Sequence, residues 1–220
     1  MKRTNLFLIL VCMSLQACAV NYSQISALKS VGDSVIENED LVVTIAIQPF
    51  GNNGRYRDRA IKNNIAFLYL SIKNKMNTSI NVEYEDINVS VGNQLIPPIE
   101  PGECTKTLKL SRWVYWLYAL FWGGSRGYDS KGDRYNVFIP FGLPIAIYNF
   151  VKATSTNNKM ADDLTTNAFQ SGEIGADKTN SGLVYLPRLP AQETSVRVRY
   201  LTRNDGARTI EIPFPRFSYP

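Results

Sequence analysis

Short stretches with the hydrophobic patterns of β-strands lie in two parts of the chain, before residue 100 and after residue 180. Leu41–Ile47 is rich in β-branched residues and is followed by Pro49, which is typical of a strand. Ile65–Ile72 is apolar at nearly every position and predicts a central strand that is covered on both faces. Residues 51–64 are polar and predict a loop. We therefore expect ordered structure to begin at Leu41.

Apolar and polar residues also alternate through Ile80–Val91, but the phase of the alternation shifts at Asp86. Apolar residues occupy even positions before Asp86 and odd positions after it. A β-bulge at Asp86 explains this shift, and so do two short strands that are broken there. Gly92 and Asn93 then predict a tight turn into a strand at Gln94–Ile96.

The C-terminal part repeats this pattern. Leu183–Leu186 predicts a strand that ends at Pro187, and Val196–Tyr200 and Ile210–Phe214 alternate on either side of the turn Asn204–Gly206. These two alternating segments predict a β-hairpin. About seven short strands in two groups favour a mainly β fold, an antiparallel two-sheet sandwich.

Residues 109–170 do not fit a plain sandwich and are expected to be an insertion. Trp113–Trp122 is apolar or aromatic throughout and holds all three tryptophans of the chain. We expect a polar loop at Gly123–Asn136 and a second apolar segment at Val137–Val151, which contains two prolines. Ser155–Phe169 has the spacing of a short helix. The insertion is therefore expected to be apolar, aromatic and partly helical.

Neither apolar segment of the insertion is long enough to span a membrane, because ten helical residues reach only about 15 Å. Three roles remain open for them. They could cover the sandwich core with buried tryptophans, place an aromatic face in lipid headgroups, or bind a protein. The candidate residues for contact with a membrane or a partner are Trp113, Trp116, Tyr118, Phe121 and Trp122.

The N-terminus has the order of a secretory signal. Lys2 and Arg3 precede the apolar run Leu6–Met13, which is too short to span a bilayer, and a small residue then precedes a cysteine in Leu15-Gln16-Ala17-Cys18. These four residues resemble the lipobox of bacterial lipoprotein precursors. An ordinary signal peptide with a chance cysteine is the alternative.

The resemblance implies cleavage between Ala17 and Cys18 and acyl chains, such as palmitate, on the thiol and the new amino group of Cys18. Several chains are needed because one holds only reversibly. In this family, Ala19 after the cysteine favours the outer membrane of the cell envelope. Three regions follow: a signal peptide at 1–17, a lipidated tether at 18–40 and one sandwich domain at 41–220. This layout is also similar to that of uncharacterised bacterial lipoproteins with an immunoglobulin-like sandwich.

Composition narrows the chemistry further. Without residues 1–17 the chain has 22 basic and 19 acidic residues, a net charge of +3 with no basic stripe, which argues against a nucleic-acid partner. Cys104 would be the one cysteine left, so we expect no internal disulfide and a buried thiol. The chain has no histidine, which removes the usual catalytic triads and the commonest metal ligand. We expect no catalytic residue, metal or cofactor.

Other motifs are weak. Gly172–Thr179 lacks the glycine before the lysine of a phosphate-binding loop, and Asp129–Asp133 lacks a full set of calcium ligands. Glu83 and Glu85 would lie about 7 Å apart on one face of a strand, as paired carboxylates for glycan hydrolysis require. The leading hypothesis is a non-enzymatic, lipid-anchored envelope protein that binds or assembles. The alternative is a hydrolase of cell-wall or surface glycans, and a purely structural role also stays open.

Overall fold

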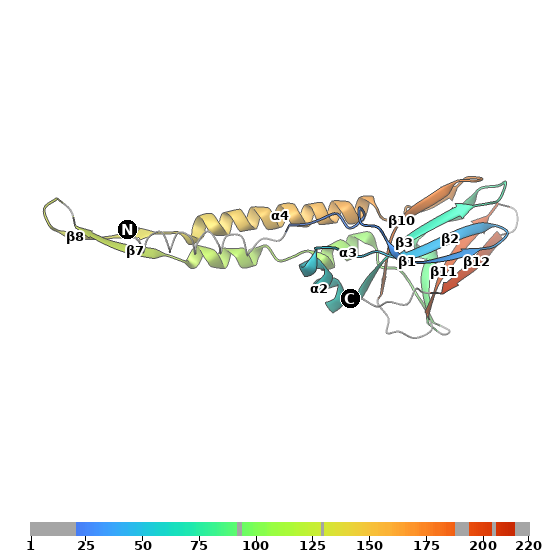
Figure 1. Cartoon of the computed structure of the whole chain (residues 1–220), viewed down its shortest axis with the longest axis horizontal. Coiled ribbons are helices and arrows are strands. Elements are labelled where there is room, and N and C mark those ends of the chain that lie inside the picture. Colours follow the sequence, from blue (N-terminus) through green and yellow to red (C-terminus); the bar gives the residue numbers. More distant parts are fainter. Residues whose placement is uncertain (1–20, 92–93, 129, 188–193, 204–205, 214–220) are drawn as a thin grey trace. The chain divides into compact units, whose positions relative to one another are not determined.

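The structure is a computed structural model that describes residues 21–91, 94–128, 130–187, 194–203 and 206–213 (Figure 1). Its contacts divide the chain into two compact units. Unit 1 consists of Met1–Tyr22 and Leu110–Lys159, and unit 2 consists of Ser23–Lys109 and Met160–Pro220.

The first sheet of unit 2 has four antiparallel strands in the order β1-β2-β3-β10. They are β1 (Val31–Glu37), β2 (Leu41–Ile47), β3 (Ile65–Asn74) and β10 (Thr179–Pro187). The strand predicted at Ile65–Ile72 is indeed central, and its first four side chains are all buried. Consecutive burial on both faces explains why its sequence is apolar almost throughout.

The second sheet of unit 2 is built around one long strand, β11. The predicted hairpin is confirmed, because β11 pairs with β12 along one edge. Its other edge pairs first with β5 and then with β4, and these pair with β6 and β9. The strands are β4 (Ile80–Val82), β5 (Ile87–Val91), β6 (Gln94–Ile96), β9 (Gly172–Ile174), β11 (Thr194–Thr202) and β12 (Gly206–Pro213).

A single turn of 3₁₀ helix, η1 (Tyr84–Asp86), causes the phase shift in the sequence. β4 ends at Val82 and β5 begins at Ile87, so the alternative with two strands is right and the simple bulge is wrong. Both strands lie along β11, and the 3₁₀ turn lets each of them turn its apolar residues inward.

The two sheets pack face to face, and the predicted class, a mainly β, antiparallel, immunoglobulin-like two-sheet sandwich, is confirmed. Hydrogen bonds also join the sheets at their margins. The Tyr200 hydroxyl on β11 donates to Asp40 Oδ2 in the β1–β2 turn at 2.8 Å, and Arg208 on β12 pairs with the same carboxylate. The arginine holds the pKa of Asp40 below its usual value, and burial raises the pKa of Tyr200.

Residues 51–64 form a helix rather than the predicted loop. Helix α2 (Gly54–Lys62) buries Tyr56 and Ala60, which lie one turn apart, and its other residues, mostly charged, are exposed or half-buried. Two buried residues in nine are too few to stand out as a helical pattern in the sequence. A second helix of unit 2, α3 (Pro101–Leu108), has proline in its first turn, where a missing N–H costs no hydrogen bond.

Ordered structure begins well before Leu41, so the predicted tether at 18–40 is too long. Val31–Glu37 forms the edge strand β1 against β2, and Ile25 is fully buried. Polar residues and a glycine separate the apolar residues Val31 and Val35 of β1. The sequence therefore lacks the regular alternation from which a strand is predicted. The segment from Ser23 to Leu41 therefore belongs to unit 2, together with the strands of the sandwich.

Three buried polar side chains hold this N-terminal segment, namely Gln48, Asn53 and Asp163. Asn53 accepts from Ser23 N at 2.9 Å and donates to Ser23 O at 2.7 Å. Asp163 Oδ2 accepts from Ile25 N at 2.8 Å, and Gln48 Nε2 donates to Ile25 O at 2.5 Å. The segment therefore has its backbone polar groups satisfied by side chains from three distant positions.

Unit 1 holds the elements of the insertion. These are the 3₁₀ helix η2 (Trp113–Leu120), strands β7 (Gly123–Tyr128) and β8 (Arg134–Ile139), and α4 (Gly142–Thr166) as far as Lys159. The loop predicted at 123–136 is wrong, because this segment forms most of a two-stranded hairpin. The rest of α4, from Met160 onward, belongs to unit 2, so the insertion is shorter than the predicted 109–170.

Helix α4 begins thirteen residues earlier than the predicted helix at 155–169. Pro144 does not break it, because it stands in the first turn of the helix. Pro140 lies between β8 and α4. Among the described residues, no helix is both long enough and apolar enough to cross a membrane.

Candidate functional site

The candidate surface lies on unit 1 and is built from η2, the hairpin and the first half of α4 (Figure 1). The side chain of Asn157 fixes the chain where unit 1 begins. Its Oδ1 accepts from Leu110 N at 2.9 Å, and its Nδ2 donates to Leu110 O at 2.8 Å. This pair of bonds aligns the segment before η2 with helix α4.

Aromatic rings join η2 to α4. The rings of Trp113 and Trp116 lie 5.5 and 5.9 Å from the ring of Phe150 on α4. The guanidinium of Arg112 lies over the same ring at 5.3 Å. Both tryptophans nevertheless stay largely accessible, with 65% of Trp113 and 40% of Trp116 exposed.

The glycines of β7 allow aromatic rings to lie directly on the hairpin backbone. A Cβ atom on Gly127 would come within 2.5 Å of the Tyr135 ring, which faces it from β8. A Cβ on Gly123 would collide with the ring of Phe141. Glycine at both positions therefore leaves room for the rings in this arrangement, although neither glycine has a positive φ.

Small and polar residues form the inner stripe of α4 in unit 1. Gly142, Ala146, Asn149 and Ala153 are buried at intervals of three or four residues. The outer side carries exposed apolar residues instead, among them Leu143, Ile147 and Val151. The helix thus buries its small residues and exposes its large apolar residues to solvent. A surface helix of a globular protein usually does the opposite.

Asn149 has a fully buried amide, and among the described residues neither its Oδ1 nor its Nδ2 has a hydrogen-bond partner. We expect Asn149→Leu to raise the free energy of unfolding by about 1–2 kcal/mol, because it removes two unsatisfied buried polar atoms at similar volume. Urea unfolding followed by tryptophan fluorescence measures this directly. Asn158→Leu, on the exposed side of the same helix, is the control and should change little. Destabilisation by Asn149→Leu would show that the amide has an essential partner.

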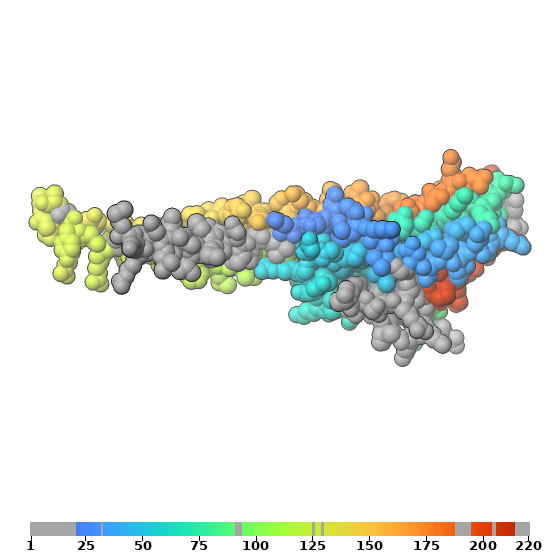
Figure 2. All heavy atoms as spheres, in the orientation of Figure 1, coloured from blue at the N-terminus to red at the C-terminus, as the bar shows by residue number. Residues whose placement is uncertain are grey.

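The exposed apolar residues of the protein are concentrated in this unit. Of 22 large apolar side chains that are exposed among the described residues, 17 lie between Trp113 and Val151. We call these 17 the apolar surface. Figure 2 shows the hairpin residues, coloured yellow-green, standing clear at the end of unit 1. Exposed apolar residues concentrated on this scale are typical of interaction sites, whereas scattered single residues need no explanation.

The residues predicted for membrane or partner contact lie on this surface, with one difference. Trp113, Trp116, Phe121 and Trp122 are exposed, whereas Tyr118 is half-buried. The alternative in which the tryptophans are buried core residues is therefore wrong. Sequence reasoning missed the hairpin residues Tyr128, Tyr135 and Phe138. The alternation of Tyr135, Val137 and Ile139 was the signal for a strand, and the glycines of β7 concealed its partner.

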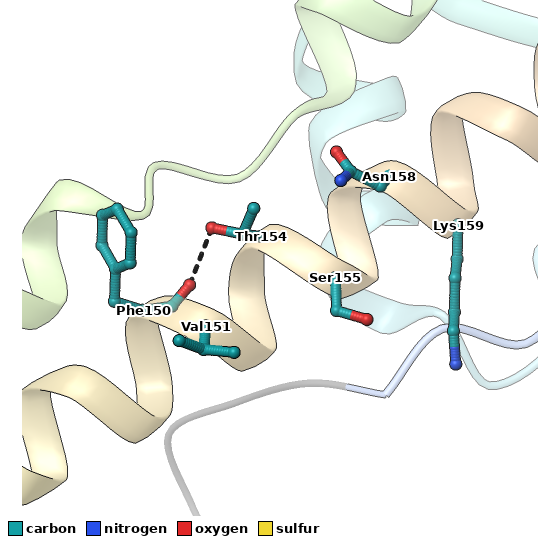
Figure 3. A pocket seen from close by; sticks show the side chains of 6 residues that line it. All are labelled: Phe150, Val151, Thr154, Ser155, Asn158 and Lys159. Atoms are coloured by element: carbon teal, nitrogen blue, oxygen red, sulfur yellow. Dashed lines mark hydrogen bonds between the residues drawn. The ribbon is translucent and has the colours of Figure 1, made fainter.

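A hollow of about 420 Å³ lies along the outer side of α4 (Figure 3). Its lining is Phe150, Val151, Thr154, Ser155, Asn158 and Lys159. The Thr154 hydroxyl donates to Phe150 O at 2.8 Å and so has no proton to offer a ligand. The lining changes from apolar to polar along the helix, which marks where the apolar surface ends.

The acidic residues considered for glycan hydrolysis do not share a strand face. Glu83 follows β4 and accepts from Asn81 Nδ2 at 2.6 Å, while Glu85 lies in the 3₁₀ turn η1. The 7 Å spacing expected for a strand therefore does not apply to them. Asp86 pairs with Arg199 at 3.8 Å, and Arg197 pairs with Glu211 on β12.

The other chemical candidates are also structural. Burial raises the pKa of the Cys104 thiol to about 12, which keeps it protonated and unreactive. In the part of the chain that the structure describes, no three Cys, Asp or Glu residues lie together as metal ligands. Ala17, Cys18 and Asp129 lie outside the described residues.

Comparison with known proteins adds little. No model of a protein family matches the sequence, and no curated protein matches it. Among solved structures, the chain resembles the GAE domain of GGA2p from Saccharomyces cerevisiae, with a TM-score of 0.28 and 8% identity over 83% of this chain and 97% of that chain. A likeness at this level carries no argument about function.

Proposed function

We propose that this protein is a non-enzymatic lipoprotein of the bacterial cell envelope that binds or assembles through the apolar surface of unit 1. The observation that carries the binding role is the division of apolar residues between the units. Among the described residues, unit 2 encloses most of its large apolar residues in a sandwich core and exposes five, whereas unit 1 exposes 17. An exposed surface of this size needs an occupant to be stable in water.

The anchor in this proposal rests on the lipobox-like residues Leu15–Cys18 and on Ala19, which favours the outer membrane. We expect Cys18→Ser to abolish acylation and to shift the protein from the detergent phase to the aqueous phase, or to leave the precursor uncleaved. Intact-mass measurement of the protein from membranes should find fatty-acyl mass on a chain that starts at Cys18. A wild-type chain without acyl mass, or with another N-terminus, would contradict the anchor.

The binding role is tested separately by photo-crosslinking in cells. A photoreactive amino acid at Phe138, on the apolar surface, should form adducts with lipid or protein. The matched control is Leu95, which is also apolar and exposed but lies in unit 2. Adducts at Leu95 alone, or at neither position, would refute binding through unit 1.

A further inference from the structure

The charge of the mature chain is divided as unevenly as its exposed apolar residues. Residues 110–159 contain six basic and two acidic residues, a net charge of +4. The remaining residues of 18–220 contain 16 basic and 17 acidic residues, a net charge of −1. The positive charge of the whole mature chain therefore lies in the same segment as the apolar surface, which suits an apolar occupant with an anionic boundary.

We propose that the apolar surface of unit 1 binds the headgroup region of an anionic lipid bilayer, as a second attachment beside the acyl chains at Cys18. This inference rests on the proposed function and names the occupant of its binding surface. The acyl anchor assists this second attachment, because it raises the effective concentration of lipid near the apolar surface.

The two faces of the hairpin differ in composition. In the observed register, Tyr135, Val137 and Ile139 of β8 share one face with Gly123 and Gly127 of β7. The opposite face carries the cations Arg126 and Arg134 together with the exposed rings of Tyr128 and Phe138. One face is thus apolar and the other mixes cations with aromatic rings, and both compositions suit the headgroup region of a bilayer.

Basic side chains on this surface lie beside aromatic rings. Arg134 Nε donates to the Tyr128 hydroxyl at 3.1 Å, and its guanidinium lies 5.7 Å from that ring. Lys152 lies 5.9 Å from the ring of Tyr148, and Arg112 lies over Trp113. All the cation–ring contacts found in the described ranges are in unit 1. Aromatic rings and adjacent cations are the groups that concentrate at the level of lipid headgroups.

The backbone of the hairpin limits how deep this surface can lie. β7 and β8 form a sheet of only two strands, and neither outer edge pairs with another strand among the described residues. Unpaired backbone groups are not tolerated in the hydrocarbon core but are hydrated among headgroups. We therefore place the apolar surface in the interface. The described part of the turn between β7 and β8 contains one acidic residue, Asp133, and the next residue in the sequence is Arg134.

The test uses the mature chain, residues 18–220, carrying Cys18→Ser so that no acyl chain contributes. Sedimentation with vesicles of 30% phosphatidylglycerol in phosphatidylcholine should exceed that with pure phosphatidylcholine at least tenfold. Binding should also shift the tryptophan emission to the blue, because all three indoles belong to the apolar surface. Equal binding to both vesicles, or binding without an emission shift, would overturn the proposal.

Two variants separate this surface from nonspecific adsorption. The double variant Trp122→Ser/Phe138→Ser should lose at least tenfold of the binding, and its exposed positions should leave the fold intact by circular dichroism. Leu95→Ser, an exposed apolar position of unit 2, should keep binding within twofold. Equal losses in both variants would overturn the proposal. Protein adducts without lipid adducts at Phe138 in cells would also overturn it, while leaving the proposed binding role in place.

Discussion

Replacement of Asp163 by alanine is expected to lower the free energy of unfolding by about 3 kcal/mol. The carboxylate is 3% exposed and accepts from Ile25 N at 2.8 Å, from the Ser26 hydroxyl and from Asn167 Nδ2. Its loss would leave the buried N–H of Ile25 without this acceptor. The segment that contains Ser23 and Ile25 should then detach more easily from unit 2. Gln48 and Asn53 would still bond to it, but the carboxylate would not.

Urea unfolding measures the loss of stability, and limited proteolysis near Ser23 measures the detachment. Asp162→Ala is a close control, since Asp162 is the preceding residue of the same helix and is exposed. It should change the free energy of unfolding by less than about 0.5 kcal/mol. If both variants unfold at the same urea concentration, the buried carboxylate does not hold the N-terminal segment.

Gly182→Ala should destabilise the sandwich by about 2–3 kcal/mol. A Cβ atom at this position of β10 would lie 2.5 Å from both N and Cα of Phe169. That backbone is fixed, because Phe169 N donates to Leu183 O at 2.9 Å and Leu183 N donates to Asn167 O at 2.7 Å. The added methyl group therefore has to break these bonds or displace β10.

Thermal unfolding compares this variant with Gly102→Ala as control. A Cβ on Gly102 meets no atom within 4 Å, and alanine favours a helix such as α3. Gly102→Ala should therefore leave the midpoint unchanged or raise it. A midpoint for Gly182→Ala as high as that of the wild type would mean that the 167–169 segment can move away from β10.

The sequence was most informative where one face of a strand is buried and the other is wet. In β11 and β12 the alternation of Val196, Val198 and Ile210 with charged residues predicts both strands and their hairpin correctly. In β4 and β5 it also located the interruption at Asp86, although it left the nature of the interruption open. Alternation is informative because the period of two has a direct physical cause in the pleat.

The sequence was least informative where buried polar side chains hold a segment by hydrogen bonds, and where both faces of a strand are exposed. β1 and the segment before it are held by the buried amides of Gln48 and Asn53, which look like surface residues in a sequence. In the hairpin β7–β8, every described side chain of β8 is exposed. With no buried face, the hairpin does not need a regular alternation of apolar and polar residues in both strands. The glycines of β7 have no side chains, so they add nothing to the hydrophobic pattern from which a strand is predicted.

The hydrogen bonds that hold Ser23 limit the distance between the sandwich domain and the membrane. If the mature chain starts at Cys18, as we propose, only five residues separate the acylated sulfur from the first residue held by Asn53. Fully extended, they reach about 17 Å, against about 75 Å for a free leash of 22 residues. The first residues of the sandwich domain would then stay within about 17 Å of the anchored leaflet. Any molecule that binds the domain must therefore approach that leaflet.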